Sequence, residues 1–237
     1  MSYLDQPMLE PEPNSTQCSC SFCNEFAHPT GAPNRKAWEG QGWVLLPSLG
    51  SFTPGYLLLM PHRHVRSFAE LSPDEFGPAT SIAEHARCEI FEEFGPTIIA
   101  EHGSGTPQAR SAACCDHAHW HLIPADIQRV AAMYEAAGGP PVLLTNVGHL
   151  TSWAAKSYIY LSPLKGVHWV WPYSQTFPSQ FVRRVCASSR GIGDFYDWAL
   201  FPFAENMLVT RQRLGARLKR ALGDSVPSGP SSEASCA

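Results

Sequence analysis

The chain has 237 residues, and its 17 Lys and Arg against 21 Asp and Glu give a formal net charge of −4. This length can bury one sizeable core, so we expect one domain, or one domain with an extension. The negative balance disfavours a broad nucleic-acid-binding face, which needs a clustered surplus of Lys and Arg. It is compatible with a small anionic substrate, because backbone amides and one or two arginines can hold a phosphate.

The two ends of the chain lack the pattern of packed elements. Residues 1–17 are polar and interrupted by proline, and residues 223–237 are rich in Ser, Gly and Pro, so we predict a disordered lead and a disordered tail. No signal peptide or membrane-spanning run is evident. The eight cysteines include Cys18-x-Cys20-x-x-Cys23, which is typical of thiolates in a reducing compartment. We therefore predict a cytoplasmic protein with no membrane partner.

The first elements after the lead predict a sheet and a long helix. Two apolar runs, 43–49 and 56–60, flank a turn rich in Gly and Pro and are expected to be neighbouring strands. Ser72-Pro73-Asp74-Glu75 supplies an N-cap, a proline at the first helical position and a capping-box glutamate. The helix that begins there is expected to end at Gly95-Pro96, with its first turn distorted by Pro78.

The remaining elements divide the chain near residue 140. Strands are predicted at 97–101 and 117–124 and a short helix at 128–137, which completes a unit of residues 18–140. Residues 141–222 are predicted to add a hairpin of strands 157–160 and 167–171 around Gly166, and helices at 179–189 and 205–222. The fold class is therefore α+β, an antiparallel sheet with flanking helices plus a small C-terminal α/β extension.

The segment at 117–121 carries the most chemical information. His117, His119 and His121 alternate with apolar residues, and in a strand residues two apart share a face. Three imidazoles in a row are poorly explained by core packing. They could hold one catalytic metal with a bound water, or one could attack phosphorus while its neighbours orient or protonate. Because the outer two rings would lie far apart, a single metal held by all three is strained, and the nucleophile is favoured.

These residues resemble a known family. His117-Ala118-His119-Trp120-His121-Leu122-Ile123 matches the His-φ-His-φ-His-φ-φ signature of the histidine triad (HIT) superfamily, in which φ is apolar. Residues 55–71 resemble the family's earlier strand and turn, and the similarity covers roughly residues 18–125. HIT proteins are hydrolases and transferases of nucleotide conjugates, and the branch of galactose-1-phosphate uridylyltransferase shares their fold. The resemblance implies a HIT-like sheet and a small-molecule nucleotide or nucleotide-conjugate substrate.

The resemblance also implies roles for the matching residues. His119 would attack the α-phosphorus and carry a covalent nucleotidyl-imidazole intermediate, while a backbone carbonyl holds its other nitrogen. His121 would contact phosphate oxygens or the leaving group. Backbone N–H groups of the loop before the triad would cradle the phosphate. The further candidates for substrate or phosphate binding are Ser111, Cys114, His102, Arg110 and Arg66.

A structural zinc site is the second implication. Zinc-bearing relatives combine a Cys pair with a histidine after the second strand and with the first triad histidine, which here gives Cys20, Cys23, His64 and His117. His62 competes with His64 for the third position, and Cys18 is an alternative thiolate. Such a site would tie the N-terminal segment to the catalytic strand.

Three questions stay open at this level. Histidine at position 121 favours the hydrolase branches, whereas the uridylyltransferase branch has glutamine there. A non-catalytic nucleotide-binding protein and a mononuclear zinc hydrolase are the alternatives to the proposed enzyme. The extension is expected to cover the mouth of the active site or to build a homodimer interface, and residues 179–184 have no chemical account.

Overall fold

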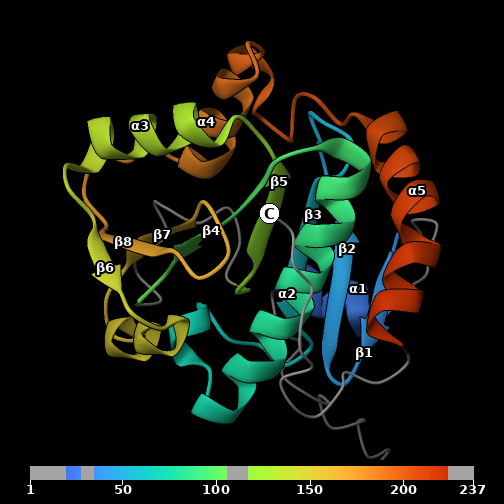
Figure 1. Ribbon diagram of the computed structural model, residues 1–237, viewed down its shortest axis with the longest axis horizontal. Helices are drawn as coiled ribbons and strands as arrows, with labels where there is room; N and C mark the ends of the chain where they lie inside the picture. The colour runs from blue at the N-terminus through green and yellow to red at the C-terminus, as the bar shows by residue number, and fades with distance from the viewer. Residues whose placement is uncertain (1–19, 28–34, 106–116, 224–237) are drawn as a thin grey trace, which may run out of the picture.

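The computed structural model describes residues 20–27, 35–105 and 117–223, so the predicted lead and nearly all of the predicted tail lie outside the described residues. One sheet of eight strands crosses the molecule in the order β1-β2-β3-β5-β4-β7-β8-β6, and every neighbouring pair is antiparallel (Figure 1). The strands are β1 (Trp38–Gly40), β2 (Trp43–Pro47), β3 (Leu57–Pro61), β4 (Thr97–Gly103), β5 (Trp120–Pro124), β6 (Val142–Leu144), β7 (Tyr158–Ser162) and β8 (His168–Pro172).

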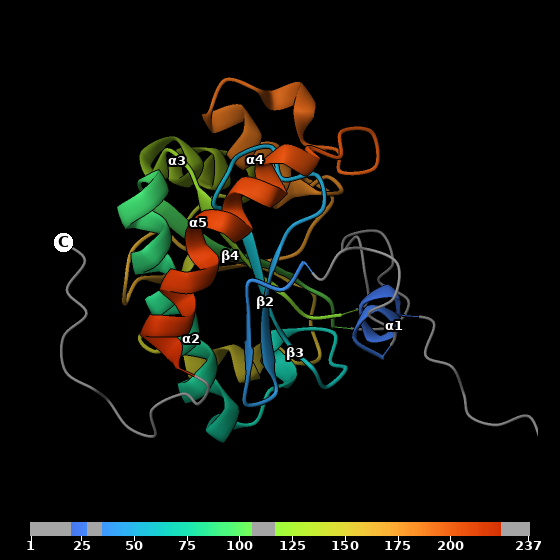
Figure 2. The ribbon, with the colours of Figure 1, turned by 90° about the vertical axis from the view of Figure 1, so that its right-hand side faces the viewer.

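Helices cover both faces of this sheet (Figures 1 and 2). They are α1 (Ser21–Ala27), α2 (Pro73–Phe94), α3 (Ile127–Gly138), α4 (Phe181–Ser189) and α5 (Ala204–Leu222), with short 3-10 segments η1 (Phe68–Glu70), η2 (Val147–Trp153) and η3 (Gly193–Phe195). The strands alternate between two cores: Leu57 and Leu59 face the α2 and α5 side, whereas Leu58 faces the α3 and α4 side. The α+β class with an antiparallel sheet and flanking helices is confirmed.

The predicted extension continues the same sheet. Strand β7 pairs with β4 from Ile99↔Ser162 to Gly103↔Tyr158, and β8 and β6 follow on its far side. The predicted hairpin around Gly166 and the two predicted C-terminal helices are present. The sheet is therefore unbroken across residue 140, and the division of the chain there stays a prediction.

Helix α2 begins and ends where its capping residues predict. The Ser72 backbone N–H donates to Glu75 Oε2 at 2.7 Å, and Gly95 follows the last turn with a φ of 93°. Pro78 lies inside the helix, which is nevertheless continuous from Pro73 to Phe94. The expected distortion therefore does not interrupt the helix.

The predicted strand at 117–124 is wrong at its start, because β5 begins at Trp120. The backbone N–H of Ala118 donates to the Val65 carbonyl at 2.7 Å, and the ladder with β3 begins only at the pair Leu59↔Trp120. The first two histidines therefore precede the strand, and the three imidazoles do not line one strand face. His117 points to a different centre from His119 and His121, as described below.

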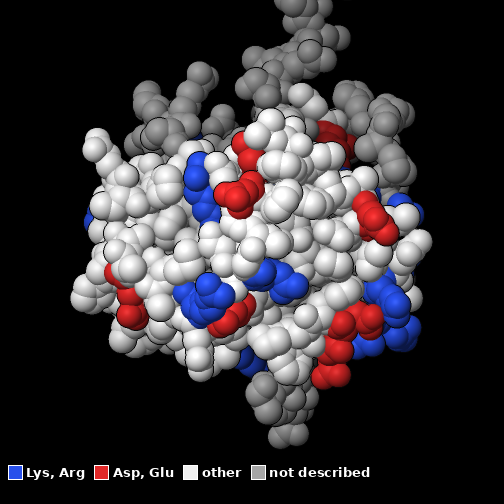
Figure 3. Space-filling model, turned by 90° about the horizontal axis from the view of Figure 1, so that it is seen from above, with Lys and Arg blue, Asp and Glu red and all other residues white. Residues whose placement is uncertain are grey.

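The surface shown in Figure 3 carries acidic and basic side chains interspersed among uncharged ones. Within the described ranges, no helix combines the length and the hydropathy needed to cross a membrane.

Candidate active site and metal centre

Four sulfur and nitrogen donors meet between α1 and the segment before β5. One ligand atom from each of Cys20, Cys23, His64 and His117 lies within 4.8 Å of every other. The distances from Cys23 Sγ to the Nδ1 atoms of His64 and His117 are 3.3 and 3.5 Å, and Cys20 Sγ lies 3.6 Å from His117 Nδ1. A tetrahedral zinc ion bound to both S and N places these atoms roughly 3.5 Å apart. The cluster can therefore hold a metal ion of this kind.

The second ring nitrogen of His117 fixes the tautomer in which the ring can bind a metal. Its Nε2–H donates to the Pro61 carbonyl at 2.7 Å, which leaves Nδ1 as the atom that faces the thiols. Burial lowers the pKa of His117 to about 4. The neutral imidazole, the form that binds metals, is thus the stable one near neutral pH.

His62 is directed away from the cluster. Its Nε2 lies 2.9 Å from Glu39 Oε1, and its ring stacks on Phe26 of α1 with centroids 5.0 Å apart. Of the two histidines that compete in the sequence, the geometry selects His64. The alternative thiolate Cys18 lies outside the described residues.

His119 is half-buried, and one of its ring nitrogens is fixed by the backbone. Its Nδ1–H donates to the carbonyl of His117 at 2.8 Å. Burial lowers the pKa of His119, although the carbonyl and the nearby Glu101 favour the charged form. The neutral ring protonated at Nδ1 has its lone pair on Nε2, which is the nucleophilic nitrogen.

His121 is fixed in the opposite way. It lies on β5, its ring centroid is 4.6 Å from that of His119, and its Nδ1 is 2.6 Å from the hydroxyl of Tyr56. Burial raises the pKa of Tyr56 to about 12, so its hydroxyl is protonated and donates to Nδ1. Burial, then the charges of His119 and Arg183, lower the pKa of His121. The neutral His121 ring therefore carries its proton on Nε2.

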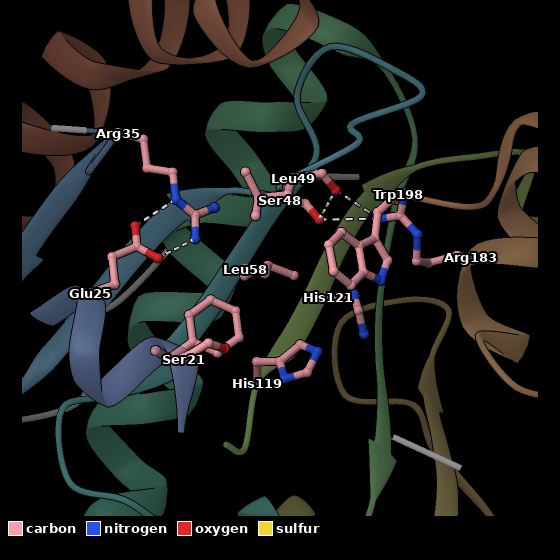
Figure 4. A pocket seen from close by; sticks show the side chains of 11 residues that line it. Ser21, Glu25, Arg35, Ser48, Leu49, Leu58, His119, His121, Arg183 and Trp198 are labelled. Atoms are coloured by element: carbon pink, nitrogen blue, oxygen red, sulfur yellow. Dashed lines mark hydrogen bonds and ion pairs between the residues drawn. The ribbon is translucent and has the colours of Figure 1, made fainter. Parts of the chain in front are cut away.

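Both histidines line one cavity on the α3 and α4 side of the sheet (Figure 4). Glu25 and Arg35 lie at one side of it and are joined by two contacts of 2.6 Å, while Arg183 and Trp198 lie at the other side. The complete described lining is Ser21, Phe22, Glu25, Arg35, Ser48, Leu49, Leu58, His119, His121, Arg183 and Trp198. The N-terminal helix and the C-terminal extension thus both contribute side chains to the wall.

The other predicted phosphate ligands are not part of this lining. Ser111, Arg110 and Cys114 lie outside the described residues. His102 lies on β4, where its ring contacts Tyr173 with centroids 4.9 Å apart and burial lowers its pKa to about 4. Arg66 instead forms an ion pair with Glu70 at 2.5 Å.

Sequence reasoning predicted only His119 and His121 among the residues of this lining, and among those that it missed are Arg183, Trp198 and the His121 partner Tyr56. Tyr56 lies within the predicted strand 56–60, but nothing local indicates that its hydroxyl meets a ring 65 positions later. Arg183 and Trp198 belong to the extension, beyond the family resemblance. Only the long-range pairing of the sheet brings them to the histidines.

No family model matches the sequence. Among solved structures, the chain is similar to a hypothetical histidine triad nucleotide-binding protein from Sulfolobus tokodaii, at 12% identity and a TM-score of 0.42 over 86% of this chain and 97% of that one. It is also similar to a Zn-bound histidine triad family protein from Mycobacterium smegmatis, at 19% identity and a TM-score of 0.37 over 45% and 74% of the two chains. A HIT family hydrolase from Clostridium thermocellum gives 16% identity and a TM-score of 0.35 over 47% and 94%.

The antiparallel sheet and the Cys–His cluster are the features that the resemblance found in the sequence implies. At these identities and TM-scores the likeness to solved structures carries no conclusion about activity, which has to be argued from this chain's own residues.

Proposed function

We propose that the chain is a nucleotide-conjugate hydrolase or nucleotidyltransferase that acts at an α-phosphate through a covalent intermediate on His119. The observation that carries this proposal is the hydrogen bond of 2.8 Å from His119 Nδ1 to the His117 carbonyl, at a ring that lines the cavity beside His121. The carbonyl stabilises the positive charge that the ring acquires when its Nε2 bonds to phosphorus.

The two rings supply complementary chemistry. His119 Nε2 attacks the α-phosphorus, so an N–P bond forms as the bond from phosphorus to the leaving group breaks. The leaving group accepts a hydrogen bond from His121 Nε2–H and takes its proton from solvent water. In the second step the oxygen of an acceptor attacks phosphorus and the N–P bond breaks. The acceptor's proton passes to solvent, which restores the starting state. Water as the acceptor gives a hydrolase, and a phosphate or another metabolite gives a transferase.

A structural zinc ion at Cys20, Cys23, His64 and His117 belongs to the same proposal. Two thiolates and two imidazoles complete a tetrahedral set, which is typical of structural zinc, whereas catalytic zinc keeps an open position for water. The ion would hold α1 against the segment that precedes β5. This donor set gives less support to a mononuclear zinc hydrolase, because His119 and His121 are outside the cluster.

The alternative is a nucleotide-binding protein without useful catalysis. It would use the same cavity but would form no covalent adduct. The histidine at position 121 leaves hydrolysis favoured over transfer, and a cytoplasmic location is part of the same expectation.

Replacement of His119 by Ala tests the mechanism. We expect turnover of nucleoside phosphoramidates and dinucleoside polyphosphates to fall by about a thousandfold or more, because no other described ring in the cavity has an unprotonated Nε2. Wild-type protein mixed with labelled substrate and quenched in alkali, in which phosphohistidine survives, should carry the label.

His149→Ala is the matched control, since this ring contacts Thr145 outside the cavity and its loss should leave the rate unchanged. Retained turnover in His119→Ala would overturn the mechanism. Tight nucleotide binding by the wild type with neither turnover nor label would favour the non-catalytic alternative.

A further inference from the structure

A buried arginine of the extension lines the same cavity as the two histidines. Arg183 lies on α4, beyond the part of the chain that resembles HIT proteins, and is 3% exposed. Figure 4 shows it across the cavity from Glu25 and Arg35. Its charge reaches His121, where after burial and His119 it is one of the causes that lower the pKa.

The guanidinium is held entirely by uncharged partners. Its Nε donates to the Tyr196 carbonyl at 2.7 Å, and its Nη1 donates to Ser48 Oγ at 3.1 Å and to the Leu49 carbonyl at 3.3 Å. Its Nη2 donates to the Gly50 carbonyl. The guanidinium carbon also lies over the ring of Tyr56, 5.3 Å from its centroid.

The charges of the cavity therefore do not cancel. Glu25 and Arg35 neutralise each other in a two-contact ion pair, and Arg183 is the other Lys or Arg in the described lining. Within the described part of the chain, no carboxylate pairs with Arg183. A buried charge without a counter-ion is costly, and the cost falls when an anion binds beside it.

We propose that Arg183 is the residue through which the C-terminal extension selects phosphorylated substrates over neutral nucleosides. Its charge attracts the phosphate group of the substrate, and its hydrogen bonds hold residues 48–50 as part of the cavity wall. This inference rests on the function proposed above for the same site. It assigns substrate discrimination to an element outside the histidine motif.

Two substitutions separate the effect of the Arg183 charge on binding from the support that its hydrogen bonds give to the cavity wall. Arg183→Gln removes the charge, and Arg183→Lys keeps the charge but loses the planar fork. The dissociation constants of adenosine 5′-monophosphate, guanosine 5′-monophosphate, their nucleosides and inorganic phosphate are measured by calorimetry for each protein. Arg184→Gln is the matched control, because the neighbouring guanidinium lies over the Tyr196 ring and outside the cavity lining.

In Arg183→Gln we expect binding of the monophosphates and of phosphate to weaken by about tenfold or more, with nucleoside affinity within about threefold of the wild type. Arg183→Lys should keep the preference for monophosphate over nucleoside within about threefold of the wild type. Equal losses of affinity for nucleoside and monophosphate in Arg183→Gln would show that Arg183 only supports the cavity wall, and would overturn the proposal.

Two further outcomes are equally decisive. If Arg183→Gln does not fold, Arg183→Lys decides: a retained preference supports the role of charge, and a lost preference overturns it. If the wild type binds no nucleotide but binds phosphate in a way that Arg183→Gln abolishes, the proposed nucleotide chemistry fails while the anion site stands.

Discussion

At the scale of single residues, the hydroxyl of Tyr56 determines which ring nitrogen of His121 carries the proton. The oxygen lies 2.6 Å from His121 Nδ1 in a fully buried contact, and the protonated phenol is the donor. His121 therefore keeps its proton on Nε2, which the proposed mechanism directs at the leaving group, whereas the His117 carbonyl keeps Nε2 of His119 unprotonated. In the proposed mechanism, these opposite tautomers on adjacent rings provide a hydrogen-bond donor beside a nucleophile.

Replacement of Tyr56 by Phe removes this contact without changing the shape of the side chain. We expect a loss of about 1–3 kcal/mol in the free energy of unfolding, because a buried acceptor loses its donor. We also expect kcat to fall by about tenfold, since the ring can adopt the unproductive tautomer. Denaturant titration and steady-state kinetics measure the two effects.

Tyr160→Phe is the matched control for this prediction. The Tyr160 hydroxyl meets Nδ1 of His168 at 2.9 Å, also buried, but neither residue lines the cavity. It should lose similar stability and keep its kcat. If both variants keep full activity, the tautomer of His121 does not matter for catalysis.

The motif predicted three candidate histidines, but not that the structure divides them between two centres. A period of two predicts a shared face for all three, yet β5 starts only at Trp120 and His117 is turned into the Cys–His cluster. This orientation of His117 depends on the hydrogen bond from the Ala118 backbone N–H to the Val65 carbonyl, which joins residues 53 positions apart. The partners Tyr56 and Arg183 are equally non-local, so no local pattern could indicate them.

At the scale of elements, α1 is a seven-residue helix with no buried residues of its own. Besides the Glu25–Arg35 ion pair, its attachment to the sheet comes from the Cys–His cluster and from two aromatic rings. Phe22 lies 6.0 Å from His119 and Phe26 lies 5.6 Å from His117, measured between ring centroids. A helix this short is unstable alone in water. We therefore expect metal binding at the cluster to decide whether α1 is folded and lines the cavity.

The loss of one thiol tests whether the cluster holds α1 in place. In Cys23→Ser we expect the bound zinc to fall from about one ion per chain to nearly none, the melting temperature to drop by several degrees and activity to fall with the loss of α1. Elemental analysis gives the zinc content. After cobalt substitution, the absorption band from thiolate to metal should also disappear.

His62→Ala is the control, because this ring contacts Glu39 and Phe26 rather than the cluster. It should keep its zinc. Zinc lost from His62→Ala and retained in His64→Ala would reverse the assignment of the third ligand. The Cys-x-x-Cys spacing predicted a metal site, but the choice between two nearby histidines needed the geometry of the turn after β3.

At the scale of the whole molecule, the C-terminal residues return to the N-terminal half. Helix α5 packs on α2, where Arg217 contacts Glu89 at 2.6 Å, and the indole Nε1–H of Trp38 donates to the Gly223 carbonyl at 2.9 Å. The sequence predicted both helices, and for α2 the capping residues also gave its two ends. It could not predict that α5 crosses back over the first strands, because that depends on packing between residues more than 100 positions apart.

This arrangement predicts that the core and the extension unfold together, although composition suggests a division near residue 140. Leu218 is fully buried on α5 and belongs to the same hydrophobic cluster as Leu57 and Trp120. Leu218→Ala should therefore lower the free energy of unfolding of the whole chain by about 2–5 kcal/mol. Tryptophan fluorescence, far-UV circular dichroism and zinc release should report one coincident transition, because the β4–β7 pairing leaves no free sheet edge at the division.

Leu208→Ala on the same helix is the matched control. Its side chain is 52% exposed, so the change should stay within about 1 kcal/mol. An early transition that melts α5 alone in Leu218→Ala, with the zinc still bound and the sheet intact, would show that the extension is a separate folding unit. In that case its contribution to the cavity through Arg183 would be a docked contact, which could open without unfolding the histidine site.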